Sequence, residues 1–243
     1  MAEFRVHDVI WNDTKINNFW DWISKNKHAN WFTKLQGKSI ITYVRQNIPL
    51  KGNILDYGSG KGYLLSYLMD YNVRLFGCDF SRESIDYIKN KFNKFPKFEN
   101  ALFIRKFPTK FKDGQFDIVF LIETIEHLTD AYYDSTLNEI HRILKKGGHI
   151  IITTPNSEDL TVNRIICPDC GGVFHMVQHL KSFTSFELAA FTSGKGFTTI
   201  RCEAVNFEHY NAKSRLRRLI KKILMDIISK NRPHLVYIGQ KND

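Results

Sequence analysis

The chain carries a strand-like segment that ends in one acid and three alternating glycines, at Asp56, Gly58, Gly60 and Gly62. The apolar residues just before them suit a buried parallel strand. The glycines, with Ser59 between them, permit a tight turn and let a ligand lie against bare backbone. A helix that begins soon after this turn directs free N-terminal amide groups toward a polar ligand. The pattern therefore predicts a nucleotide-binding turn, with a glycine spacing unlike that of the dinucleotide fingerprint.

A second set of reactive residues follows an apolar segment at 116–122 and consists of Glu123, Glu126 and His127. Positions i, i+3 and i+4 share one side of a helical turn, so the three side chains are expected to lie together. Two carboxylates and an imidazole can supply a general base, hold a metal ion, or only cap and pack the turn. Among them, we favour His127 as the base or as the group that orients an acceptor.

A third set has the spacing Cys-x2-Cys-x4-His-x3-His and comprises Cys167, Cys170, His175 and His179. A Cys-Pro-x-Cys-Gly turn directs two thiolates at one ion, and two histidines can complete a closed tetrahedral zinc site. We therefore predict a structural Zn²⁺ that stabilises an insertion at 156–183. Two free thiols with two unrelated histidines are the alternative, and either histidine can instead serve an active site.

The elements that must position these residues alternate between strand and helix after residue 50, as in a doubly wound parallel sheet. The helices are expected to begin near Lys61, Arg82 and Asp130, with another at 184–194 and an amphipathic basic one at 214–230. Residues 1–50 are rich in aromatic side chains and read as helices that cover a sheet edge or form a lid. The expected strands are 53–57, 73–79, 101–105, 116–122, 148–154, 197–206 and 234–240.

The glycine turn and its surroundings resemble the class I S-adenosylmethionine-dependent methyltransferases. In that family Asp79, about 20 residues after the glycines, would bind the ribose hydroxyls. The resemblance implies a seven-stranded Rossmann-like sheet at 51–243, behind a helical lid at 1–50. One departure is that no acid follows the third strand at 102–107, where the family often contacts adenine. The cofactor-binding candidates are Asp56, Gly58, Ser59, Gly60, Gly62, Asp79, Phe80, Ile122 and Glu123.

Two branches of that family resemble the Glu-x-x-Glu-His stretch at 123–127. One methylates small molecules, and it leads us to predict O-methylation of a small polar metabolite or of a sugar- or phosphate-containing substrate. The other methylates the 2′-hydroxyl of small RNAs and joins this stretch to a later histidine, matched here by His179 before Phe183 and Thr184, to bind Mg²⁺. A scaffold that binds cofactor without turnover is the third hypothesis.

The net charge of +10 is concentrated, because residues 211–232 contribute +7 of it. The helix at 214–230 is expected to pack its apolar stripe on the sheet or in a homodimer. Its basic face has no aromatic side chains, which disfavours a nucleic-acid partner. No apolar run approaches the ~20 residues that span a bilayer, so a cytoplasmic protein without a membrane segment is expected.

Overall fold

The computed structural model describes residues 4–26, 31–210 and 232–242. The predicted helix at 214–230 lies outside these ranges. Among the described residues, no helix has both the length and the apolar character that crossing a membrane requires.

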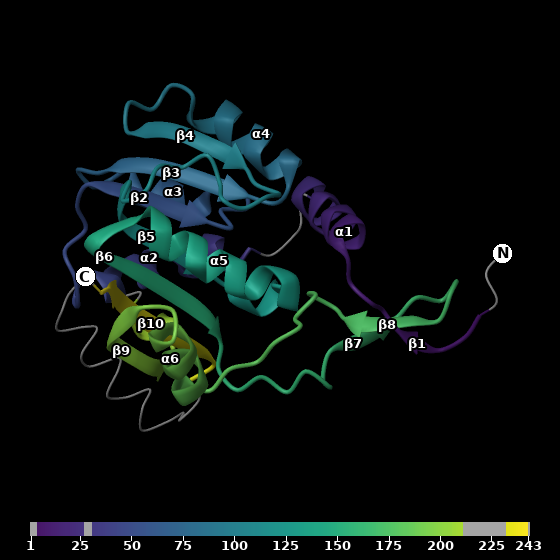
Figure 1. The fold of residues 1–243 in the computed structure, drawn as a ribbon. Helices are drawn as coiled ribbons and strands as arrows, with labels where there is room; N and C mark the ends of the chain where they lie inside the picture. The colour runs from purple at the N-terminus through teal and green to yellow at the C-terminus, as the bar shows by residue number, and fades with distance from the viewer. Residues whose placement is uncertain (1–3, 27–30, 211–231, 243) are drawn as a thin grey trace.

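A seven-stranded sheet forms the centre of the molecule, in the order β4-β3-β2-β5-β6-β10-β9 (Figure 1). The strands from β4 to β6 pair in parallel, and β10 is antiparallel to both of its neighbours. The predicted seven-stranded Rossmann-like sheet is confirmed. The strands are β2 (Asn53–Tyr57), β3 (Arg74–Asp79), β4 (Phe98–Phe103), β5 (Phe116–Ile122), β6 (Leu144–Pro155), β9 (Phe197–Val205) and β10 (His234–Lys241).

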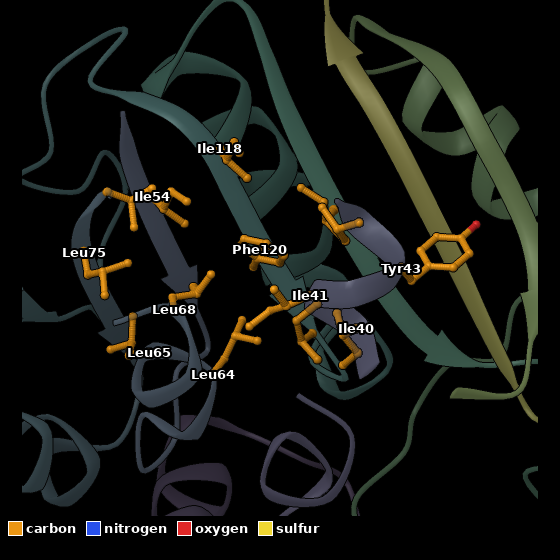
Figure 2. Packing of buried hydrophobic residues seen from close by; sticks show 14 of the residues in the cluster. Ile40, Ile41, Tyr43, Ile54, Leu64, Leu65, Leu68, Leu75, Ile118 and Phe120 are labelled. Carbon is orange, nitrogen blue, oxygen red and sulfur yellow. The ribbon is translucent and has the colours of Figure 1, made fainter. Parts of the chain in front are cut away.

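Helices cover both faces of this sheet because its central strands are apolar on both sides. One core cluster joins Ile54 and Phe120 to α2, α3 and α4, and the other joins Leu55 and Val119 to α5 and α6. Figure 2 shows the first face, where Leu64, Leu65 and Leu68 pack toward the strands. The helices are α1 (Asp13–Lys25), α2 (Phe32–Val44), α3 (Tyr63–Leu68), α4 (Arg82–Phe92), α5 (Asp130–Ile143) and α6 (Ser185–Ser193), with short 3₁₀ turns η1 (Ile125–His127) and η2 (Phe207–Tyr210).

The third parallel strand differs from the prediction of 101–105, because β4 begins at Phe98 and ends at Phe103. Its register explains the shift. Phe98 pairs with Leu75 and Phe103 pairs with Asp79, so β4 begins opposite the second residue of β3 and ends with it. Leu75 and Asp79 therefore fix bounds that the apolar pattern alone placed later.

A second, smaller sheet projects from the main body in the order β1-β8-β7 (Figure 1). β7 (Arg164–Ile166) and β8 (Gly172–His175) form an antiparallel pair within the predicted insertion at 156–183. β1 (His7–Asp8) comes from the N-terminal segment and pairs in parallel with β8. The insertion and the start of the chain are thus one structural unit, which we name the β1-β8-β7 arm.

The glycine turn closes at Gly62, which adopts a φ of 66° at the start of α3. A Cβ at this position would lie 2.8 Å from the Phe92 ring and 3.1 Å from Ile88 Cγ1. Gly114 has a similar φ of 58°, but a Cβ there would meet only Lys145 Cα at 3.9 Å. The two glycines therefore share one backbone conformation in very different surroundings.

We expect Gly114→Ala to lower the free energy of unfolding by about 1–2 kcal/mol, because an alanine in the left-handed region is strained. Gly62→Ala should lower the free energy of unfolding by about 1–3 kcal/mol more than Gly114→Ala does, because its methyl group also overpacks against Phe92 and Ile88. Urea unfolding followed by circular dichroism measures both. Equal losses for the two variants would contradict the packing role of Gly62.

Candidate active site

A cavity of about 510 Å³ opens at the carboxyl ends of the parallel strands, where ligands bind in open α/β sheets. Its wall combines the glycine turn and the ends of β3 and β5 with α1 and residues 176–179. Trp31 covers the glycine turn closely, since a Cβ on Gly60 would lie 2.6 Å from its ring. The cavity therefore lies between the sheet edge and the N-terminal helices.

Asp79 links the glycine turn to the end of β3. Its carboxylate accepts hydrogen bonds from the backbone N–H groups of Gly60 at 2.8 Å and Ser81 at 2.7 Å. Burial raises the pKa of Asp79 to about 6, although the N–H donors act in the opposite direction. Above that pH the side chain is an ionised acceptor for hydroxyl groups in the cavity, as the ribose assignment requires.

Most of the predicted cofactor-binding residues line this cavity: Gly58, Ser59, Gly60, Asp79, Phe80, Ile122 and Glu123. Asp56 and Gly62 do not belong to its wall. Asp56 is buried beneath the turn, and burial followed by the nearby Asp79 raises its pKa to about 8. Asp56 and Gly62 thus lie where they can support the shape of the turn.

The end of β5 carries the predicted catalytic residues in strained and buried surroundings. Glu123 has a φ of 42°, a left-handed conformation that costs a non-glycine residue about 1–3 kcal/mol and is common at functional sites. Glu126 is fully buried, and neither of its carboxylate oxygens accepts a hydrogen bond of normal geometry. Burial and the neighbouring Glu123 raise the pKa of Glu126 well above its usual value. The site therefore favours a proton or a cation at these carboxylates.

His127 faces Glu126, with its Nε2 atom 3.8 Å from Glu126 Oε1. Its Nδ1 atom lies 3.3 Å from the Gln178 carbonyl oxygen, which can only accept, so Nδ1 carries the proton. Burial and the adjacent His179 lower the pKa of His127 to about 3. The imidazole is therefore neutral at pH 7, with an unprotonated Nε2 directed toward Glu126.

Residues 178–180 are attached to the turn that holds Glu126 and His127. Gln178 is fully buried, and its amide donates to the His127 carbonyl oxygen at 3.0 Å. Its side-chain oxygen accepts from the Trp20 indole at 2.8 Å, and the Leu180 N–H donates to the Glu126 carbonyl oxygen at 2.8 Å. These bonds fix the insertion and α1 against the end of β5.

His179 reaches the same cluster and is shared by two groups of potential metal ligands. Its ring lies 4.9 Å from that of His127, and Glu126, His127 and His179 have ligand atoms within 4.8 Å of one another. Glu158, His175 and His179 form the second group. His179 Nδ1 lies 2.5 Å from Glu158 Oε2, so this carboxylate holds the ring in place.

The predicted Cys2His2 zinc site is not assembled as a unit. His175 and His179 stack on each other beside Glu158, with ring centroids 4.7 Å apart. Neither potential metal group among the described residues includes Cys167 or Cys170. β8 ends at His175, and residues 176–179, which follow it, line the cavity.

Several residues of the site were not predicted from the sequence. Glu158 and Gln178 lie in irregular segments and belong to no motif, so no spacing could have marked them. Trp20 packs edge-on against His127 with centroids 4.8 Å apart, and Arg105 lines the cavity where the family often has an acid. The aromatic richness of residues 1–50 was a signal for Trp20 and Trp31, although it could not say which wall they form.

Comparison with known proteins identifies the family. A model of the methyltransferase domain family matches residues 32–202. The chain belongs to that family. It is a class I S-adenosylmethionine-dependent methyltransferase. The ubiquinone/menaquinone biosynthesis C-methyltransferase of Geotalea uraniireducens is 28% identical to this methyltransferase over 172 residues, which cover 62% of this chain and 72% of the relative.

A second relative is matched over a smaller share of both chains. An uncharacterised protein of Methanocaldococcus jannaschii is 29% identical over 130 residues, or 54% of this chain, and the match spans about half of that relative, at 52%. Among solved structures, the 1,6-didemethyltoxoflavin-N1-methyltransferase of Burkholderia thailandensis, with bound S-adenosylhomocysteine, has a TM-score of 0.68 at 15% identity. That match covers 98% of this chain and 94% of the other, and at such low identity it shows a shared fold.

We expect the affinity of the methyltransferase for S-adenosylhomocysteine to fall as the pH drops through about 6, where Asp79 becomes protonated and loses its acceptor character. Well below that pH the decline should approach about tenfold per pH unit for a single proton. Isothermal titration calorimetry between pH 5 and pH 8 measures it. Asp79→Asn should bind weakly with a flat pH profile, whereas exposed Asp86→Asn should follow the wild type. An unchanged profile in Asp79→Asn would refute the assignment.

We expect Glu158→Ala to release the His179 ring from its fixed tautomer, because the carboxylate that accepts from Nδ1 is removed. ¹⁵N NMR of histidine-labelled protein should show His179 protonated at Nδ1 in the wild type and mixed between both nitrogens in the variant. Glu99→Ala, at an exposed position of β4, is the control. A His179 signal that Glu158→Ala leaves unaltered would show that Glu158 does not position the ring.

Proposed function

We propose that the methyltransferase O-methylates a small hydroxylated acceptor and that Glu126, His127 and His179 hold a divalent cation beside it. The observation that carries this proposal is the fully buried Glu126 carboxylate, which lacks a hydrogen bond of normal geometry at both oxygens. A buried carboxylate without a counter-charge is unfavourable. A cation held by the two neighbouring histidines would neutralise its charge.

The donor set fits a divalent cation on two counts. Carboxylate oxygens and neutral imidazole nitrogens together suit ions such as Mn²⁺. Each histidine also has its second ring nitrogen engaged, His127 with the Gln178 carbonyl oxygen and His179 with Glu158. Such outer partners orient the imidazoles and are the usual companions of metal-ligating histidines.

The remaining roles follow from the cavity wall. The glycine turn and Asp79 are placed to hold the nucleoside end of the cofactor, which would bring its sulfonium end toward Ile122 and Glu123. Bound S-adenosylmethionine supplies the methyl group, and a bound cation lowers the pKa of an acceptor hydroxyl. Without a cation, neutral His127 offers Nε2 as a base, and its pKa of about 3 makes it a weak one. Alignment of the acceptor by these residues is the main contribution that methyl transfer needs.

The acceptor class follows from the shape of the site. The cavity of about 510 Å³ lies within the usual range for small-molecule pockets, and α1 with Trp20 closes it as a lid over the cluster. A small molecule therefore fits better than a folded nucleic acid. The names of two relatives specify a C-methyltransferase and an N1-methyltransferase, so relatives do not select the acceptor atom. The cation site is what favours oxygen.

The same three ligands keep RNA 2′-O-methylation as the second candidate. Glu126, His127 and His179 lie together as the resemblance to the small-RNA enzymes predicts. A short RNA with a free 3′ end can offer a terminal ribose to the cavity without entering it further. Methyl transfer to such RNA, with none to small diols, would favour this candidate over the first.

A structural Zn²⁺ at Cys167 and Cys170 is also part of the proposal. Neither thiol forms a disulfide, and both are partly exposed. With His175 and His179 engaged beside Glu158, the ligands that complete such a site must come from elsewhere.

We expect protein stripped with EDTA to lose acceptor-dependent formation of S-adenosylhomocysteine and to regain it with Mn²⁺. The acceptors to test are catechol, a nucleoside with a free 2′,3′-diol, a hexose phosphate and a short RNA. Electron paramagnetic resonance of free Mn²⁺ should show at least tenfold weaker binding in Glu126→Gln and His127→Ala, because each loses a ligand of the cluster.

His141→Ala is the matched control, because His141 lies on α5 and packs on Phe197, outside the cavity wall. It should bind Mn²⁺ and form product as the wild type does. Full methyl transfer by EDTA-treated protein would overturn the cation and leave His127 as an unassisted base.

A further inference from the structure

The β1-β8-β7 arm has little of its own to hold it together. β1, β7 and β8 contain two, three and four residues. No residue of these strands belongs to either core cluster of the described chain. Val6, Ile165 and Ile166 are exposed by 64%, 45% and 46%. Sheets this small are marginal in water without a further crosslink or ion. The arm therefore calls for a stabilising element.

The turn from Cys167 to Cys170 has the backbone arrangement of a metal-binding knuckle. The backbone N–H groups of Cys170 and Asp169 and the Cys170 thiol all hydrogen-bond to the Cys167 sulfur. The turn is closed by hydrogen bonds from Cys167 N to Gly172 O at 2.8 Å and from Gly171 N to Cys167 O at 2.9 Å. Two neighbouring thiols are thus presented on one side of a fixed turn, and N–H donors favour the thiolate that zinc requires.

The N-terminal strand brings a histidine to this turn. His7 pairs with Gly172 in the parallel register, and its N–H donates to the Gly171 carbonyl oxygen at 3.1 Å. The His7 Nδ1 atom lies 2.7 Å from the Arg5 carbonyl oxygen, which can only accept. Nδ1 is therefore protonated, and Nε2 is left with the lone pair that a metal ion needs.

The His7 ring and the Cys170 thiol border the same small space. A Cβ built on Gly172 would lie 3.4 Å from Cys170 Sγ and 3.7 Å from His7 Nε2. Val9 Cγ2, at 3.0 Å from the same point, also borders this space, so a side chain at position 172 would crowd all three groups. The three donor atoms do not all lie within 4.8 Å of one another, so ion binding requires them to move closer together.

We propose that Cys167, Cys170 and His7 bind one Zn²⁺ ion, which fastens the N-terminal strand to the insertion. This set replaces the sequence-based choice of His175 and His179, whose rings are directed at Glu158 and the cavity. Water is expected at the fourth position of the tetrahedron. The proposal does not rest on the cation at Glu126, because the two sites share no residue.

The ion would act on the cavity through aromatic packing. Trp11 packs edge-on against Phe174 of β8 with centroids 5.8 Å apart, and against Phe19 of α1 with centroids 5.6 Å apart. Fastening β1 to β8 therefore fixes the start of α1, whose residues line the cavity. The zinc ion stabilises the lid from outside the active site.

Cobalt(II) titration of the full-length, tag-free protein tests the site. A thiolate-to-cobalt charge-transfer band reports only an ion bound to cysteine, so a cation at Glu126 does not interfere. The wild type should show the band and retain about one zinc ion per chain against a chromophoric chelator. Cys167→Ser should lose the band, and His7→Ala should bind zinc at least tenfold more weakly.

His175→Ala and His141→Ala should keep both the band and the wild-type zinc affinity. Wild-type zinc affinity in His7→Ala would overturn the proposal, as would loss of the band in His175→Ala. A wild-type protein that shows no band, or whose two thiols are oxidised to a disulfide in zinc-replete medium, would overturn it equally. Circular dichroism of each variant, which should match the wild type, separates loss of a ligand from loss of the fold.

Discussion

The arrangement of the candidate active site depends on the buried carboxylate of Glu126. It is fully buried at the end of β5, and Glu123 beside it adds a second carboxylate instead of a counter-charge. Low dielectric makes such a pair unstable unless a proton or a cation compensates it. The left-handed backbone at Glu123 and the engaged outer nitrogens of His127 and His179 all act to keep this arrangement. Packing in the core of the sheet must offset the free energy that the strained backbone and buried carboxylates cost.

The geometry of parallel strands explains why cofactor and acceptor groups meet. The glycine turn follows β2, Asp79 ends β3, and Glu123 follows β5, which are neighbouring strands of one sheet. Their carboxyl ends lie at one edge, so groups far apart in sequence share one cavity. Gln178 then attaches the insertion to this edge through His127 and Trp20. Methyl transfer depends on alignment, and these hydrogen bonds hold the residues of this edge in place relative to one another.

The N-terminal segment has two roles that its sequence does not separate. Its helix α1 lines the cavity, whereas its strand β1 belongs to the arm formed by the insertion. Trp11 connects the two through Phe174 and Phe19. A contact between the start of the chain and residue 174 closes a long loop, so its stability depends on tertiary packing. This connection is why the arm can influence a site that none of its three strands enters.

Local signals in the sequence were enough to predict the sheet, the glycine turn and the residues at the end of β5. Apolar runs and glycine spacing are local signals, and they placed β2, β5 and β10 within a residue of their observed bounds. Which groups face one another depended on long-range packing. It separated His175 and His179 from the cysteines, brought Glu158 to His179, and set His7 beside Cys170. Spacing along the chain predicts neighbours within one turn or strand, whereas the direction of a chain after it leaves β8 depends on packing against α1 and η1. Local pattern therefore indicated the cofactor, and long-range packing decided which candidate metal ligands lie together.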